Sequence, residues 1–340
     1  MRSAKQSVCA ERQTMAVQFE MPLISSLAQL PLYGITRAAL AVGVFDGVHL
    51  GHCKLIKELE RLAGELDAYP VAVTFSPHPR QLLFPDSPPQ LLLGAQEKAR
   101  LLFRAGARAL VTLPFTEELA RLSPEEFLEK YIFLPSLEIA AICVGKKWRF
   151  GAGGKGDCLF LENEAKKRNF LFSPVEEKLF AGEKEFVISS SSIREAVKKG
   201  DLSLARALLG RPYSLSGKVV KGYKIAGTVL GTPTANLQWE EGVLPPDGVY
   251  AAGTEVDGKY FMGAVNLGFA PTFDYEKKER RLELHLLDFP AGKTLYDRHL
   301  TLDLWEFLRE EKEFASPEEL KKAIANDIKR IREIFQEEEK

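Results

Sequence analysis

Residues 43–52, Gly-Val-Phe-Asp-Gly-Val-His-Leu-Gly-His, limit the possible folds of this chain more than any other stretch. They follow an apolar run, residues 38–42, that is typical of a buried strand. Residues 53–62 come next and carry apolar side chains at helical spacing. The stretch is therefore predicted to turn a strand into a helix. Because a helix N-terminus presents unpaired N–H groups with partial positive charge, this turn suits a phosphate group.

Two of the five histidines of the chain, His49 and His52, lie in this turn. Gly51 lies between them and lets the backbone approach a ligand closely. A purely structural interpretation is also open, in which the two imidazoles make only local hydrogen bonds. We interpret the stretch as part of a nucleotide triphosphate site.

Strand-like runs alternate with helical ones from residue 38 to about residue 172. Predicted strands cover residues 38–42, 70–75, 109–113 and 139–144, and predicted helices include residues 95–105 and one that opens at Ser123. This alternation predicts βαβ units and a parallel sheet, with ligands at the carboxyl ends of the strands. A further helix opens at residues 189–192, four serines whose ordinary role is capping, and Arg194 lies one turn into it.

The pattern changes at Tyr213, where short segments of period two are separated by Gly, Pro and Asp. Residues 256–259, Val-Asp-Gly-Lys, form a strong hairpin signal. These features predict a compact, mostly antiparallel β-barrel with a C-terminal helix that opens at Ser316 and covers one side of it. We expect an N-terminal extension that is peripheral or poorly ordered (residues 1–33), an α/β domain (34–209) and a barrel domain (210–340).

Composition narrows the classes of partner. Lys and Arg number 46 against 47 Asp and Glu, so the net charge is −1, which argues against nucleic acid as a main partner. The sequence contains no run of 18 apolar residues, so we expect no membrane span. The four cysteines show neither a C-x-x-C pair nor zinc spacing, which favours a reducing cytoplasm. We expect a cytoplasmic monomer or weak homo-oligomer that acts on small molecules.

Six motifs, in order along the chain, resemble those of the bacterial bifunctional riboflavin kinase/FMN adenylyltransferases, also called FAD synthetases. In the first half they are residues 43–52, Phe75-x-Pro77-His78-Pro79 and Ser189-Ser190-Ser191-x-x-Arg194. In the second half they are Gly231-x-Pro233-Thr234-Ala235-Asn236, Asn266-Leu267-Gly268 with Pro271-Thr272, and residues 282–289. The resemblance implies a nucleotidyltransferase-type, Rossmann-like sheet followed by a riboflavin kinase barrel. It also implies ATP-dependent phosphorylation of riboflavin to FMN and adenylylation of FMN to FAD, with Mg²⁺ as cofactor.

The resemblance assigns roles to residues of the first half. An ATP site would comprise Gly43, Phe45, Asp46, His49, His52, Ser190, Ser191 and Arg194. Of these, His49, His52 and Arg194 would be catalytic, because adenylyl transfer requires charge stabilisation rather than a base. The flavin nucleotide would contact Phe75, Pro77, Arg149 and Phe150.

In the second half the resemblance implies a nucleotide site with Gly231, Pro233, Thr234 and Asn236. Thr234 and Asn236 would bind Mg²⁺ through oxygen. Glu283 would be the catalytic base that takes the proton of the attacking hydroxyl. From the residues alone, a carboxylate on a barrel strand more often faces water, and Pro-Thr-Ala-Asn more often forms a turn.

The chain departs from the family pattern at several positions. Lys147 stands where the family has Asp or Asn, Val44 replaces a common Asn, and Gly227-Thr228 replaces an expected Gly-Arg. A long cation at 147 would either attract a phosphate or disturb the orientation of the flavin nucleotide. Two alternatives therefore accompany the bifunctional enzyme: a riboflavin kinase with an impaired first half, and a non-catalytic flavin- or nucleotide-binding protein.

Overall fold

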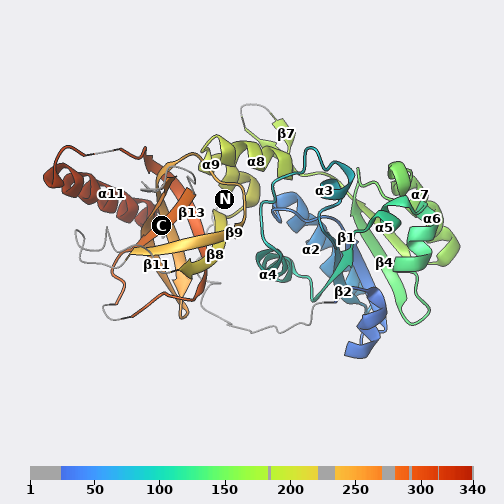
Figure 1. Cartoon of the computed structure of the whole chain (residues 1–340). Coiled ribbons are helices and arrows are strands. Elements are labelled where there is room, and N and C mark those ends of the chain that lie inside the picture. Colours follow the sequence, from blue (N-terminus) through green and yellow to red (C-terminus); the bar gives the residue numbers. More distant parts are fainter. Residues whose placement is uncertain are drawn as a thin grey trace. The chain divides into compact units, whose positions relative to one another are not determined.

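The computed structural model describes residues 24–182, 185–220, 234–269, 280–290, 293–312 and 314–338. The chain divides into two compact units, which are described separately below (Figure 1). The first comprises the described residues up to Arg194 together with Leu208–Gly210, and the second comprises Glu195–Ala207 and the described residues from Arg211 onward. The predicted order, an α/β unit followed by a β-barrel, is confirmed.

The first unit is built on a five-stranded sheet in which every pairing is parallel and the strand order is β3-β2-β1-β4-β5. Its strands are β1 (Arg37–Val42), β2 (Tyr69–Ser76), β3 (Ala109–Pro114), β4 (Glu138–Gly145) and β5 (Leu171–Val175). The four strands predicted from apolar runs are β1 to β4, and β5 was not predicted.

Helices pack on both faces of this sheet (Figure 1). The helices of this unit are η2 (Leu27–Tyr33), α2 (Leu50–Glu65), α3 (Pro79–Leu83), α4 (Ala95–Ala105), α5 (Glu117–Arg121), α6 (Pro124–Phe127), η3 (Leu128–Ile132), η4 (Ala152–Gly154) and α7 (Cys158–Arg168). Helix α8 (Ser190–Lys198) begins in this unit, and most of α9 (Leu202–Leu209) belongs to the second. A two-stranded ribbon, β6 (Leu179–Ala181) and β7 (Glu185–Val187), precedes α8. Both faces of β1 are buried, which explains its uninterrupted apolar sequence.

The order of the strands reverses between β1 and β4, the point at which open parallel sheets bind ligands. The turn after β1 carries residues 43–49, and the segment after β4 begins at Lys146. The two segments therefore leave the sheet side by side at its carboxyl edge, and this places the candidate site.

Residues 24–33 differ from the expected peripheral extension. Leu27 and Leu30 are fully buried in the core of the first unit, and Ile24 forms a bridge to Val111 of β3. Ser26 begins η2 with a capping box. Because the bridge lies at the edge of the sheet beside β3 and the apolar side chains belong to the core, this segment is part of the folded unit. Residues 1–23 lie outside the described residues.

The second unit is a closed barrel with the strand order β10-β11-β12-β9-β8-β13, and its described pairings are all antiparallel. Its strands are β8 (Tyr213–Val220), β9 (Thr234–Glu241), β10 (Gly248–Val256), β11 (Lys259–Phe269), β12 (Arg280–Leu286) and β13 (His299–Arg309). The predicted hairpin joins β10 to β11, with Asp257 and Gly258 both at positive φ.

The last helix, α11 (Pro317–Glu338), covers part of the outside of the barrel, as the apolar stripe predicted (Figure 1). Ile331 and Ile334 are buried there against Ala251 and Leu287. Among the described residues, none of the helices combines the length and the apolar character that a membrane crossing requires.

Candidate active sites

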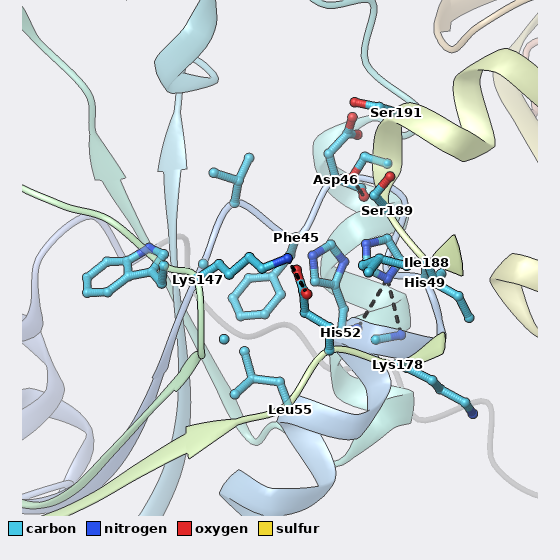
Figure 2. A pocket seen from close by; sticks show the side chains of 18 of the residues that line it. Phe45, Asp46, His49, His52, Leu55, Lys147, Lys178, Ile188, Ser189 and Ser191 are labelled. Carbon is cyan, nitrogen blue, oxygen red and sulfur yellow. Dashed lines mark hydrogen bonds and ion pairs between the residues drawn. The ribbon is translucent and has the colours of Figure 1, made fainter. Parts of the chain in front are cut away.

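A cavity of about 420 Å³ opens at the carboxyl ends of β1 and β4 in the first unit (Figure 2). All eight residues predicted to bind ATP line it, although they come from two stretches about 140 residues apart: Gly43, Phe45, Asp46, His49, His52, Ser190, Ser191 and Arg194. The remaining lining residues include His78, Arg80 and the segments after β4 and β5.

His49 is the N-cap of α2. Its Nδ1 accepts hydrogen bonds from the backbone N–H groups of Gly51 (3.2 Å) and His52 (3.3 Å). A ring nitrogen that accepts carries no proton, so the neutral imidazole holds its proton on Nε2. The structural and functional interpretations of this histidine are thus compatible, because the cap bonds fix a tautomer whose Nε2–H can donate to a phosphate oxygen.

Gly51 makes room for this cap. A Cβ at position 51 would lie 3.0 Å from Cε1 and 3.1 Å from Nδ1 of His49. The His49 and His52 rings stack with centroids 3.7 Å apart, and Phe45 meets His52 edge-on at 5.3 Å. The His-x-Gly-His spacing therefore holds two imidazoles as a rigid pair at the N-terminus of α2 (Figure 2).

Asp46 is the link between the two stretches. Its Oδ1 accepts from the backbone N–H of Leu92 (2.9 Å), its Oδ2 pairs with Nη2 of Arg194 (2.5 Å), and its carbonyl oxygen accepts from Oγ of Ser190 (2.8 Å). Arg194 also donates from Nε to the carbonyl oxygen of Gln90 (2.6 Å). The Asp46 side chain is only 2% exposed. Its ion pair with Arg194 and the bond from Arg194 to Gln90 hold the guanidinium against the turn.

A second helix N-terminus, that of α8, also borders the cavity. Ser189 and Ser192 cap it reciprocally: Oγ of Ser189 accepts from the N–H of Ser192 (3.2 Å), and the N–H of Ser189 donates to Oγ of Ser192 (3.1 Å). Ser191 is exposed beside this cap, and Ser190 is already bonded to Asp46. With α2, two helix N-termini with partial positive charge face one cavity, which suits a polyphosphate.

Lys147 extends from the end of β4 toward the side of the cavity where His52 lies (Figure 2). Its Nζ lies 2.6 Å from Oε2 of Glu177, which follows β5. Lys146 pairs with Glu176 in the same way. Because both lysine side chains are exposed, each ion pair holds its lysine only weakly and leaves it open to exchange its partner for a ligand anion.

In the second unit, Glu283 lies on β12 between Leu282 and Leu284, which point into the barrel and are buried. Glu283 therefore occupies the outer face. Its direct neighbours across the ladder are Asn236 on β9 and Asn266 on β11, so three polar side chains form a row across three strands. Oδ1 of Asn236 and Oδ1 of Asn266 are both buried, and neither has a hydrogen-bond partner among the described residues.

Burial raises the pKa of Glu283 above its usual value; nearby Arg281 opposes this rise and Glu311 adds to it. A carboxylate with a raised pKa is a stronger base, which suits proton removal from a hydroxyl group. Gly231, Pro233 and the side chain of Thr234 lie outside the described residues, so the structure places only the backbone of Thr234, opposite His285.

Comparisons with known proteins match both units. The family model for FAD synthetase matches residues 35–192, and the model for riboflavin kinase matches residues 209–335. The chain is 37% identical over 287 residues to a bifunctional riboflavin kinase/FMN adenylyltransferase of Pseudomonas fluorescens, covering 84% of this chain and 89% of that protein. The chain belongs to the bifunctional riboflavin kinase/FMN adenylyltransferase family.

Other members and structures agree with this placement. The protein of the same name from Escherichia coli K12 is 35% identical over 315 residues, covering 92% of this chain and 96% of the relative. A crystal structure titled macrolide-efflux protein from Streptococcus pneumoniae superposes with a TM-score of 0.75 at 28% identity, over 87% of this chain and 94% of that one. The two-unit architecture is thus shared over nearly the full length of these proteins.

The four residues that the family motifs assign to the flavin nucleotide lie away from the lining of this cavity. Phe75 and Phe150 are buried core residues that both pack on Phe127. Pro77 follows a cis peptide bond between β2 and α3, and Arg149 is exposed and paired with Asp157. Trp148, which does line the cavity, stacks on Phe150, so this aromatic cluster supports the cavity wall from behind.

Several residues at the two sites were not predicted from the sequence. The segment after β5 contributes Glu176, Glu177 and Lys178 to the cavity, and β5 itself has Ser173 and Pro174 in place of an apolar run. On the barrel, Asn266 belongs to the Asn-Leu-Gly motif, but its position beside Glu283 follows only from the register of β11 and β12.

Proposed function

We infer that this protein phosphorylates riboflavin to FMN on its barrel and adenylylates FMN to FAD on its parallel-sheet unit, with ATP as co-substrate of both steps. Membership of the family carries this inference. The observation that supports it most directly is that residues of two motifs, 43–52 and 189–194, line one cavity, while Glu283 and Asn236 lie side by side on another unit.

We propose that adenylyl transfer depends on positioned positive charge. The phosphate of FMN is ionised at neutral pH; its oxygen attacks the α-phosphate of ATP, and pyrophosphate leaves. Nε2–H of His49, the imidazole of His52 and the N-terminus of α2 would stabilise the charge that develops on the ATP phosphates. Arg194, with Ser190 and Ser191, would hold the departing pyrophosphate at the N-terminus of α8. We propose that the flavin nucleotide enters beside the cluster that contains Phe75, Pro77, Arg149 and Phe150.

We propose that Glu283 accepts the proton of the ribityl hydroxyl as its oxygen attacks the γ-phosphate of ATP; ADP leaves. Asn236 fits a Mg²⁺ site, because its buried Oδ1 has no partner among the described residues and an amide oxygen is a hard ligand. Thr234 would complete the protein ligands, with Gly231 and Pro233 shaping the nucleotide loop. The bound Mg²⁺ would neutralise charge on the ATP phosphates.

We further propose a cytoplasmic monomer or weak homo-oligomer with no nucleic-acid partner. Cys53, Cys143 and Cys158, the cysteines among the described residues, form no disulfide with one another, which supports a reducing compartment. The net charge of −1 supports the absence of a polyanion partner. Functional domains of residues 34–209 and 210–340 would each carry one reaction.

Incubation of the purified protein with riboflavin, ATP and Mg²⁺, followed by chromatography of the flavins, tests the proposal. Formation of FAD supports it. FMN alone would mean an impaired first unit, and unchanged riboflavin would mean a non-catalytic binding protein. Glu283→Gln is expected to abolish FMN formation and to leave FMN-to-FAD conversion intact, whereas His52→Ala is expected to do the reverse. Joint loss in a folded variant would contradict two independent sites.

A further inference from the structure

Asn266 is the neighbour of Glu283 on the side away from Asn236. The ladder pairs Asn266 of β11 directly with Glu283 of β12, and Glu283 directly with Asn236 of β9. Directly opposed residues on antiparallel strands point to the same face of the sheet, and their Cβ atoms lie about 5 Å apart. Asn266 is therefore within reach of a ligand group that contacts Glu283.

Glu311, just after β13, determines how the Asn266 amide is turned. Nδ2 of Asn266 donates to Oε1 of Glu311 at 3.0 Å. An ionised carboxylate only accepts hydrogen bonds, so it must face the NH₂ end of the amide. The carbonyl end is thereby directed away from Glu311, and its Oδ1 is buried with no partner in the part of the chain that the structure describes. A buried acceptor of this kind is costly unless a ligand donates to it.

Gly268 provides the space for this arrangement. It lies two residues after Asn266 on β11, hence on the same face. A Cβ at position 268 would lie 2.8 Å from Cδ of Glu311, which is closer than such atoms can approach. Each residue of the Asn-Leu-Gly motif thus has a structural role. Asn266 binds the Glu311 carboxylate, Leu267 is buried inside the barrel, and Gly268 leaves space for the carboxylate.

We propose that Oδ1 of Asn266 accepts a hydrogen bond from a hydroxyl group of the polyol chain of the flavin substrate, and that Glu311 is the positioning residue that holds the amide in this orientation. The inference rests on the proposed kinase function. Riboflavin carries several adjacent hydroxyl groups, so when one of them reaches Glu283, a second reaches the side chain on the next strand. Asn236, on the other side of Glu283, is left for the nucleotide and its metal.

Four variants test this inference through equilibrium binding of riboflavin, measured by flavin fluorescence, and through the KM values for riboflavin and ATP. Glu311→Ala leaves the amide free to turn and is expected to raise the Kd for riboflavin about tenfold, with the KM for ATP changed less than about twofold. Glu311→Gln is expected to restore most of the affinity, since a glutamine carbonyl still accepts from Nδ2. Asn266→Ala alone and combined with Glu311→Ala should give the same loss, because both changes remove one interaction.

Glu310→Ala is the matched control, because Glu310 is exposed and its backbone carbonyl, not its side chain, accepts the hydrogen bond from its neighbour Arg309. FMN-to-FAD conversion should be unchanged in every variant. Equal losses in Glu311→Ala and Glu311→Gln would mean that charge, rather than amide orientation, matters, and would overturn the inference. An unaltered Kd for riboflavin in Glu311→Ala would also overturn it. A wild-type protein that makes no FMN would instead defeat the proposed function.

Discussion

The carboxylate of Asp46 and the guanidinium of Arg194 form an ion pair of 2.5 Å between residues 148 positions apart in the sequence. Both side chains are largely buried, at 2% and 11% exposure. Asp46 also binds the backbone of Leu92, so the pair joins the turn after β1, the segment before α4 (Ala95–Ala105) and helix α8. The Asp46 carboxylate therefore serves the cavity chiefly by fixing Arg194.

Asp46→Asn removes the charge but keeps the size of this side chain. Loss of one partner from a buried ion pair is expected to lower the free energy of unfolding by about 3 kcal/mol. Without this ion pair the guanidinium of Arg194 is no longer held in place, and a misplaced group cannot stabilise the transition state. We therefore expect kcat/KM for FMN-to-FAD conversion to fall on the order of 100-fold. Urea unfolding and the FAD-forming assay measure the two effects.

Asp86→Asn is the control for this change, since Asp86 is an exposed aspartate of the same unit. Riboflavin phosphorylation should be unaffected by either variant. If the effects of Asp46→Asn and Arg194→Gln simply add in the double variant, the two residues act independently and the interpretation fails.

Gly51→Ala tests the cap at the start of α2. The new Cβ would come within 3.0 Å of the His49 ring, so the imidazole must shift and lose its bonds to the N–H groups of residues 51 and 52. We expect a rise of about tenfold in the KM for ATP in adenylyl transfer, because the Nε2–H donor moves with the ring.

Gly64→Ala, in the same helix, is the matched comparison. A Cβ at position 64 would meet no heavy atom within 4 Å, and this variant should gain about 0.5 kcal/mol of stability without a change in the KM for ATP. Equal effects of the two substitutions on the KM for ATP would show that helix stability, and not the His49 cap, governs nucleotide binding.

Lys147, which replaces the Asp or Asn of the family pattern, is balanced by Glu177 at 2.6 Å. Because the lysine end of this pair is exposed, the ion pair contributes little free energy, so a phosphate dianion can replace the carboxylate as the partner of the lysine. Because Lys147 follows β4, on the other side of the strand reversal from α2, we expect it to contact the phosphate of FMN. Lys147→Ala should raise the KM for FMN about tenfold and leave the KM for ATP unchanged.

Glu177→Gln should act in the opposite direction and lower the KM for FMN. Lys146→Ala removes a neighbouring lysine that is paired with Glu176, and it should have little effect. If Lys147→Ala instead lowers the KM for FMN, the long side chain of Lys147 disturbs the orientation of the flavin nucleotide and does not bind its phosphate.

Much of the first unit could be predicted because its signals are local. Helix α4 has the predicted bounds, and the eight predicted ATP residues line one cavity because parallel strands bring their carboxyl ends to one edge. Strand β5 was missed because Ser173 and Pro174 interrupt its apolar pattern at the edge of the sheet. The contribution of Glu177 was missed with it.

Contacts that depend on three-dimensional register could not be predicted. Asn266 and Glu311 are 45 residues apart in the sequence. Asn266 lies on β11 and Glu311 follows β13, and these two strands are not neighbours in the barrel. No rule of sequence spacing predicts a contact between two such residues. The aromatic residues of the flavin motifs show a second limit. Phe75 and Phe150 are buried, and an apolar side chain in a motif can support a site without lining it.

His78 gives the stability of the first unit a dependence on pH. It is the N-cap of α3, where its Nδ1 accepts from the N–H of Arg80 at 3.1 Å, and Gln81 completes the capping box. Burial lowers the pKa of His78 below 6.5, and the charges of Arg194, Lys98 and Arg80 lower it further, against the opposing effect of Asp46. Near pH 6.5 the unfolded chain therefore binds more protons at this position than the folded chain does.

It follows that the contribution of His78 to stability is complete above about pH 6.5 and is lost as the pH falls through its lowered folded pKa. Urea unfolding followed by Trp148 fluorescence, in a background of Trp239→Phe and Trp305→Phe, should show a less stable first unit at pH 5.5 than at pH 7.5. His78→Asn keeps a capping side chain that does not titrate, so its stability should vary less between these pH values. An equally steep pH dependence in His78→Asn would assign the effect to other groups.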